Sequence, residues 1–260
     1  MSTRAFAELT WPEVERAIAA GAVALWPIGS TEAHGPHLPL DTDRIIAEET
    51  CRRAQASIRD RLGIDALILP PLTFTVTEFA KPFAGTLTLP RETVLAFVRD
   101  AAREIARQGF RAVCLVNGHL EPGHRFMLRD AVRSASEGAP CPIGIADPAD
   151  ARFARTLTAE LASGSCHAGQ YETSLLLAAG GDTVREAERA RLAPLEIDLV
   201  QAIRGGAPSF KEAGAALAYC GDPKAATRAE GEVSYARLAS IVTEVVTELL
   251  KEQPFSKEQP

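Results

Sequence analysis

The chain has 260 residues and a mass of 27.8 kDa, which suits one large domain or two small ones. Its net charge of −6, with no basic cluster in the sequence, excludes nucleic acid as an expected partner. The sequence contains no uninterrupted apolar span long enough to cross a membrane and no signal-peptide core at its start. Five scattered cysteines, an odd number, indicate reduced thiols and a cytoplasmic location.

Strand and helix patterns alternate along most of the chain. Apolar runs predict strands at residues 22–28, 66–69, 112–117 and 142–146. Helix-forming segments lie at residues 42–59, 88–107, 125–134, 148–162, 171–179 and 232–250. This order predicts an α/β fold with three layers, in which helices flank a mostly parallel sheet. We expect a single domain over residues 1–250, followed by a flexible polar tail at residues 251–260.

A Gly- and Pro-rich loop follows the first predicted strand and carries five charged or imidazole side chains. They are Glu32, His34, His37, Asp41 and Asp43. Carboxylates and imidazoles at close spacing are typical ligands of divalent metals. Alternate side chains of an extended segment share a face, so Glu32 and His34 can point at one centre. The alternative interpretation is a polar surface loop, because short motifs give false positives.

The strand at residues 112–117 is followed in the same way, by His119 and Glu121. Ligands of an open α/β sheet bind at the carboxyl ends of its strands. Two neighbouring strand ends would bring together five ligands, namely Glu32, His34, Asp43, His119 and Glu121. Five ligands exceed the needs of one tetrahedral zinc ion, and they suit two divalent metals that share a bridging carboxylate and a hydroxide.

These motifs resemble those of the creatininase (creatinine amidohydrolase) family. The segment from Gly29 to Asp43 is similar to the family's Gly-Ser-x-Glu-x-His-Gly-Pro-His-Leu-Pro-x-x-x-Asp signature, and Asn117 to Glu121 is similar to its second motif. Two further segments fit the family in the expected order, His167–Ser174 and the weaker Gly221–Thr227. The resemblance therefore extends over nearly the whole chain and implies a creatininase-like fold and a homohexamer.

The resemblance also implies a role for each matching residue. Glu32 and His119 would hold one metal, His34 and Glu121 would hold the other, and Asp43 would bridge them. His167 would lie beside the metals as a proton donor or acceptor, with Glu172 as its partner, so we expect both to be catalytic together with Glu121. The family uses zinc, manganese or iron, and the sequence does not choose among them.

The expected reaction is metal-dependent hydrolysis of a non-peptide C–N bond in a small-molecule amide. A metal-bridging hydroxide would attack the carbonyl group, and His167 would deliver a proton to the leaving nitrogen. We expect a cyclic amide or a formamide. The family pattern places tryptophans just before the His-Ala-Gly motif, whereas this chain has only Trp11 and Trp26 and offers the small residues Ala162–Cys166 there. Open alternatives are creatinine itself, a peptidase or deformylase in cofactor biosynthesis, and a metal-binding protein without catalysis.

Two more segments have open interpretations. The irregular stretch from Leu72 to Thr88 resembles a family segment near the active site, so we expect a substrate-side loop with some strand character. The loop from Gly205 to Cys220 is our candidate for a subunit contact. His124 has either a capping role or a site role, and Cys166 could be a nucleophile, although a metal hydroxide would make that unnecessary.

Overall fold

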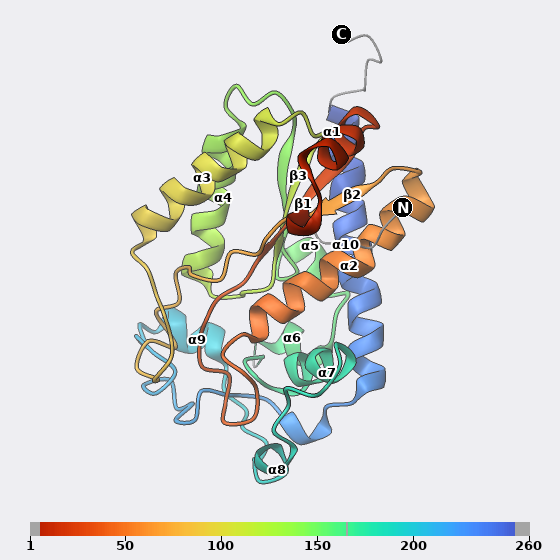
Figure 1. Ribbon diagram of the computed structural model, residues 1–260. Coiled ribbons are helices and arrows are strands. Elements are labelled where there is room, and N and C mark those ends of the chain that lie inside the picture. The colour runs from red at the N-terminus through yellow and green to blue at the C-terminus, as the bar shows by residue number, and fades with distance from the viewer. Residues whose placement is uncertain (1–5, 165, 253–260) are drawn as a thin grey trace.

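Four strands form one sheet in the part of the chain that the computed structural model describes, residues 6–164 and 166–252 (Figure 1). They are β1 (Val23–Ile28), β2 (Ala66–Ile68), β3 (Val113–Asn117) and β4 (Ile143–Ala146). The strand order is β2-β1-β3-β4, and every neighbouring pair is parallel. The sequence predicted each strand, and each is one residue shorter than predicted.

Helices make up most of the remaining described residues. In chain order they are α1 (Trp11–Ala19), α2 (Thr42–Leu62), α3 (Arg91–Arg107), α4 (Pro122–Ser136), α5 (Ala151–Ala154), α6 (Ala159–Ser163), α7 (Gln170–Ala178), α8 (Glu186–Arg189), α9 (Leu199–Arg204) and α10 (Arg228–Glu252). Two short 3-10 helices, η1 (Phe6–Glu8) and η2 (Pro223–Ala225), complete the set. Among the described residues, no helix combines the length and the apolar character needed to span a membrane.

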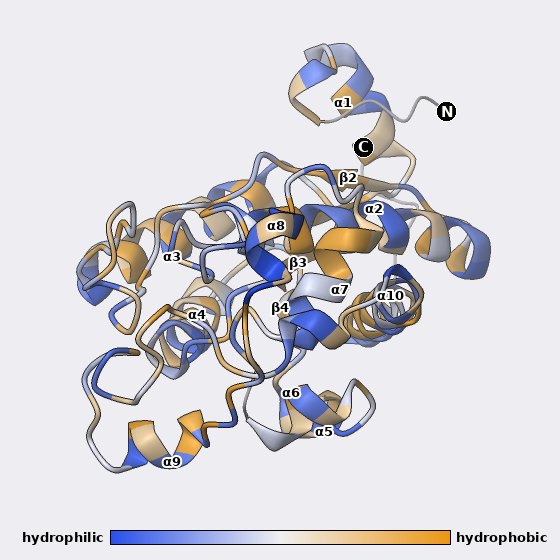
Figure 2. Cartoon of the chain, turned by 90° about the horizontal axis from the view of Figure 1, so that it is seen from below, coloured by the Kyte–Doolittle hydropathy of each residue, from blue (hydrophilic) through white to orange (hydrophobic). Residues whose placement is uncertain are grey.

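Helices cover both faces of the sheet, so the predicted three-layer α/β fold is confirmed. Figures 1 and 2 show α3 and α4 on one face, and α2, α7 and α10 on the other. The alternation of side chains along β1 explains the two layers. Val23 and Leu25 pack into the core cluster on the α2 and α10 side, whereas Ala24 and Trp26 pack into the cluster on the α3 and α4 side.

The helix predicted at residues 148–162 is instead two short helices, α5 and α6. Two side chains explain the break, because each caps a new helix N-terminus. Asp150 accepts a hydrogen bond from the backbone N–H of Arg152, and Thr158 accepts one from that of Leu161. Of the tail predicted at residues 251–260, residues 251 and 252 belong to α10 and the others lie outside the described residues.

Candidate metal centre

The carboxyl ends of β1 and β3 lie side by side against the first turn of α2. Ile28 pairs with Asn117 at the last step of the parallel ladder. The glycine that follows β3, Gly118, makes the close approach possible, since a Cβ atom there would lie 2.4 Å from the carbonyl oxygen of Asp43. The loops after both strands can therefore carry side chains to Asp43 at the start of α2.

Asp43 lies at the middle of the resulting cluster. Its Oδ1 is 3.1 Å from Nε2 of His34, and its Oδ2 is 2.9 Å from Nδ1 of His119. The hydroxyl group of Ser30 donates a hydrogen bond of 2.8 Å to Oδ2. All four side chains are buried. The two carboxylate oxygens of Asp43 thus face two different imidazoles, one from each strand-end loop.

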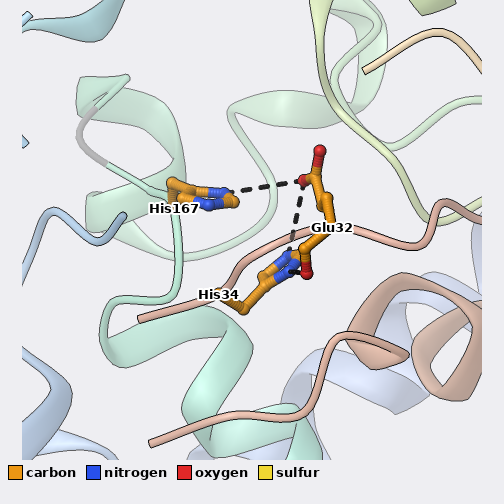
Figure 3. A group of neighbouring side chains, drawn as sticks. All are labelled: Glu32, His34 and His167. Carbon is orange, nitrogen blue, oxygen red and sulfur yellow. Dashed lines mark hydrogen bonds and ion pairs between the residues drawn. The ribbon is translucent and has the colours of Figure 1, made fainter. Parts of the chain in front are cut away.

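Glu32 lies against three histidines of the cluster. Its Oε1 is 3.4 Å from Nδ1 of His119, 3.7 Å from Nε2 of His34 and 4.0 Å from Nδ1 of His167. Figure 3 shows the rings of His34 and His167 on the same side of this carboxylate. The hydroxyl group of Thr77, in the irregular loop after β2, donates a hydrogen bond to the other oxygen of Glu32.

Glu172 enters the same cluster from the first turn of α7. Its Oε2 is 3.6 Å from Nε2 of His34 and accepts a 2.7 Å hydrogen bond from the backbone N–H of Ala168. Ala168 has a φ of 50°, an uncommon conformation for a residue with a Cβ atom, and it directly follows His167. Burial raises the pKa of Glu172 to about 8, against the opposing effect of His34. Glu172 therefore both faces the cluster and fixes the turn that carries His167.

The ring orientations of three histidines suit a metal site. One ring nitrogen of each histidine lies close to a backbone carbonyl oxygen. Nδ1 of His34 is 3.2 Å from the carbonyl oxygen of Glu32. Nε2 of His119 is 3.1 Å from that of Val76, and Nε2 of His167 is 2.9 Å from that of Ala33. We assign the ring N–H to these nitrogens, which leaves the other nitrogen of each ring facing the carboxylates. Metal-ligating histidines use the same pattern, with one nitrogen on the metal and the other donating to a carbonyl group.

The charges of the cluster point to the same use. Burial opposes the charged form of His34, but Asp43, Glu172 and Glu32 together raise its pKa to about 10. Burial would raise the pKa of Asp43, yet His34 and His119 hold it below its usual range. Nε2 of His34 lies among oxygens of all three carboxylates, at 3.1 Å from Asp43, 3.6 Å from Glu172 and 3.7 Å from Glu32. Asp43 and Glu32 thus have lowered pKa values despite their burial because positive charge lies nearby, and divalent cations could supply such charge.

Ligand atoms of six residues fall into three overlapping groups, each within 4.8 Å. They are Glu32–Asp43–His119, His34–Asp43–Glu172 and Glu32–His34–His167. The structure therefore brings together four of the five predicted metal ligands, namely Glu32, His34, Asp43 and His119. Glu172, which we expected as a partner of His167, completes the group that contains His34 and Asp43.

Glu121 lies outside these groups, on the wall of the adjoining cavity. Its Oε1 and Oε2 accept hydrogen bonds of 3.2 and 3.1 Å from the backbone N–H groups of Glu78 and Phe79. Burial raises the pKa of Glu121. The local sequence could not show this arrangement, because the chain turns into α4 at Pro122 and the loop after β2 meets the carboxylate there.

His124, whose role the sequence left open, is buried behind the cluster. Its Nδ1 is 2.7 Å from the hydroxyl oxygen of Thr75, and its Nε2 is 3.0 Å from Oδ1 of Asn117. The same Oδ1 accepts a hydrogen bond from the backbone N–H of His119, and the Asn117 amide donates to the carbonyl oxygen of His119. His124 therefore supports the turn that aims His119. His37 is also buried, with Nε2 2.9 Å from the hydroxyl oxygen of Thr173.

A cavity of about 640 Å³ opens beside the cluster. Its lining includes the small residues that the sequence placed before the His-Ala-Gly motif, namely Ala162, Ser163, Gly164 and Cys166. Burial raises the pKa of Cys166 well above the usual value, which disfavours a nucleophilic thiolate.

The expected substrate-side loop contributes Phe79 to the cavity lining and shows the expected strand character in isolated bridges at Leu72 and Thr75. Sequence reasoning missed the lining residues Arg125, Leu199, Arg204 and Phe210, for which the local sequence carries no signal.

Together these features define an α/β protein with a buried cluster of carboxylates and imidazoles at the strand ends, and this cluster could hold divalent metals. The family model for creatinine amidohydrolase matches residues 7–246, so the chain belongs to the creatininase family of hydrolases.

Relatives and solved structures agree with this assignment. The mycofactocin precursor peptide peptidase of Mycobacterium ulcerans (strain Agy99) is 32% identical over 234 residues, which are 88% of this chain and 82% of that protein. The creatinine amidohydrolase of Pseudomonas putida is 37% identical over 120 residues, 44% of each chain. A crystal structure of creatininase has a TM-score of 0.73 and 25% identity, with 96% of this chain and 98% of that chain covered. Manganese and zinc–zinc forms of creatininase share the fold.

Proposed function

We propose that the protein is a dinuclear-metal amidohydrolase that cleaves a C–N bond in a small amide. The observation that carries the proposal is the position of Asp43, whose two oxygens face His34 and His119 separately. Each of these imidazoles belongs to its own ligand group, completed by Glu172 or Glu32. Glu32, Asp43 and His119 would hold one ion, and His34, Asp43 and Glu172 the other, with zinc, manganese or iron as candidates.

The bound cations would supply Lewis acidity, which lowers the pKa of a coordinated water and stabilises negative charge on a carbonyl oxygen. Glu121 is then free for proton transfer. Burial raises its pKa, and the backbone N–H groups of Glu78 and Phe79 fix its carboxylate on the cavity wall. A carboxyl group tuned in this way can take a proton from the attacking water and return it to the leaving nitrogen.

The geometry of His167 favours a proton acceptor over the proton donor that we expected. Nε2 lies 2.9 Å from the carbonyl oxygen of Ala33, so Nδ1 is the nitrogen that faces the cluster without a proton. Burial and the nearby charge of His34 lower the pKa of His167 to about 4, and the ring therefore stays neutral. A neutral ring can accept a hydrogen bond from an N–H group of the substrate.

Two candidate substrate classes come from the named relatives, a peptide and creatinine. No tryptophan lines the described part of the cavity, which supports the proposal that creatinine is at best a poor substrate. Cavities of about 300–1,000 Å³ typically bury ligands of drug size, so about 640 Å³ leaves room for an extended amide or a short peptide. A cyclic amide or a formamide remains our first proposal, and a peptidase activity is the second.

The test combines metal analysis with a substrate panel. We expect about two ions per chain after loading with zinc or manganese, and fewer in Asp43→Asn, which loses the shared carboxylate charge. The loaded protein is then assayed on creatinine, hydantoins, lactams, formamides and short peptides. Fewer than about one ion per chain, with Asp43→Asn no lower, would contradict the metal proposal. Two bound ions without hydrolysis of any compound would support the non-catalytic alternative.

Two further expectations stay proposals. The family resemblance supports a homohexamer, which sedimentation at micromolar concentration tests. The odd number of cysteines supports a cytoplasmic location.

A further inference from the structure

Two arginines line the cavity outside the metal-ligand groups. Arg125 lies in the first half of α4, and Arg204 ends α9. Nε of Arg125 donates to both carboxylate oxygens of the buried Asp147, at 3.1 and 2.8 Å. The two terminal nitrogens of Arg125 have no hydrogen bond to any described residue. Asp147 therefore fixes a half-buried guanidinium while leaving donors free.

Two carboxylates on the cavity wall outside the metal-ligand groups already have partners. Glu121 accepts the backbone N–H groups of Glu78 and Phe79. Asp198 caps α9 by accepting the backbone N–H of Gln201 at 2.8 Å. Within residues 6–164 and 166–252, neither carboxylate forms an ion pair with Arg125, and Arg204 forms no side-chain hydrogen bond or ion pair. This part of the wall therefore offers unused donors and positive charge.

We propose that the substrate carries a carboxylate, which the terminal nitrogens of Arg125 bind and which the exposed Arg204 attracts toward the cavity. The inference deepens the proposed amidohydrolase function and rests on it, because both arginines line the same cavity as Glu32, Asp43 and Glu121. A guanidinium matches a carboxylate with parallel N–H groups, and its fixation by Asp147 lowers the entropy lost on binding.

Selectivity follows from the same geometry. A neutral carboxamide offers the Arg125 donors one uncharged acceptor oxygen in place of the two charged oxygens of a carboxylate, so the site should discriminate against it. A hydrogen bond to a charged group is worth roughly ten- to a hundredfold in affinity. The carboxylate could be the C-terminus of a peptide or an acidic side chain, since both present the same group to the guanidinium.

The test measures binding to the metal-loaded protein by calorimetry. N-acetylphenylalanine is compared with N-acetylphenylalanine amide, which has the same size but no charge. N-acetylglutamate amide is a third probe, whose carboxylate lies on the side chain. We expect at least one carboxylate probe to bind roughly ten- to a hundredfold more tightly than the neutral amide. The better of the two identifies the source of the carboxylate.

Three variants assign the preference to its residue. Arg125→Gln should reduce the preference to about threefold or less, and Arg204→Gln should reduce it in part. Arg129→Gln is the matched control, because Arg129 also contacts Asp147, at 3.3 Å, but does not line the cavity; it should keep the preference. If Arg125→Gln does not fold, Arg125→Lys is the second variant. It retains the positive charge but loses the paired N–H groups of the guanidinium, so it should give an intermediate preference.

Two results would overturn the inference. One is equal binding of charged and neutral probes by the unsubstituted protein. The other is a preference that survives in folded, metal-loaded Arg125→Gln, which would mean that the carboxylate binds the metals instead. Neither result depends on turnover, so a failure of the proposed hydrolysis and a failure of carboxylate recognition are distinguishable.

Discussion

The ring of Phe210 lies flat on the ring of His167, with 4.1 Å between the ring centroids and 15° between the planes. The backbone N–H of Phe210 donates to the carbonyl oxygen of Phe79 at 3.0 Å, and the two phenyl rings meet edge to face at 5.5 Å. The segment 205–220 therefore covers one face of His167 through Phe210, and the segment 72–88 packs against Phe210 through Phe79. Part of the loop that we expected to contact another subunit packs within its own chain.

Phe210→Ala should loosen His167 and lower turnover more than it weakens substrate binding. Removing a buried phenylalanine costs about 3–5 kcal/mol of stability when the site cannot collapse, and stacking adds about 0.5–1.5 kcal/mol. Steady-state kinetics should show a fall in kcat of about tenfold or more with a smaller change in KM, together with a lower Tm. Phe126→Ala, at a side chain that is 60% exposed, is the control and should change neither. An unchanged kcat in Phe210→Ala would show that the stacking of Phe210 on His167 does not contribute to turnover.

The sequence predicted the sheet and most of the cluster for physical reasons. Strand periodicity and glycine turns are local signals, and parallel strands bring their carboxyl ends to one edge. Glu32, His34, Asp43 and His119 follow from that logic alone. The same logic also placed Glu121 in the cluster and did not include Glu172, because the positions of these two side chains depend on where α4 and α7 begin. Phe210 lies 43 positions after His167, beyond α7, α8 and α9, and no local sequence pattern predicts such a long-range contact.

Substituting Glu172 or Glu121 by glutamine should separate a ligand from a proton carrier. Glu172→Gln removes a carboxylate that faces His34, so elemental analysis should show the loss of about one ion per chain. Glu121→Gln should keep both ions and lower turnover by about a hundredfold or more, because general acid–base catalysis contributes on that scale. The reverse pattern, with metal lost only in Glu121→Gln, would favour the assignment predicted from the sequence, in which Glu121 is a metal ligand.

His124→Phe should weaken the metal site without touching a ligand atom. The ring is similar in shape, but it leaves the Thr75 hydroxyl group without its 2.7 Å partner and removes the 3.0 Å contact to Asn117. Each unpaired buried group costs about 1–3 kcal/mol. Loss of a residue that orients a ligand typically weakens metal affinity by about 10–100-fold. Competition with a chelator measures the metal affinity directly. An unchanged affinity in His124→Phe would show that His124 has only a packing role.

The metal-free protein should lose stability as the pH rises from about 6.5 to 9. Asp43, Glu172 and Glu32 raise the pKa of His34 to about 10 despite its burial, so its contribution is complete below pH 6.5 and is lost as the pH approaches 10. Burial raises the pKa of Glu172 from 4.5 to about 8, so its ionisation opposes folding over that range. Both effects therefore lower the free energy of unfolding as the pH rises.

Metal binding should cancel this trend, because the cations replace the protons and their binding strengthens as protons leave the ligands. Thermal unfolding of chelator-treated protein should show a Tm that falls by several degrees between pH 6.5 and 9, since about 1 kcal/mol moves the Tm of a chain this long by roughly 2–4 °C. The loaded protein should fall less. Glu172→Gln cannot ionise at this position, so its metal-free form should have a shallower slope. A metal-free Tm that rises with pH would show that the buried histidines do not carry the charge that balances the carboxylates.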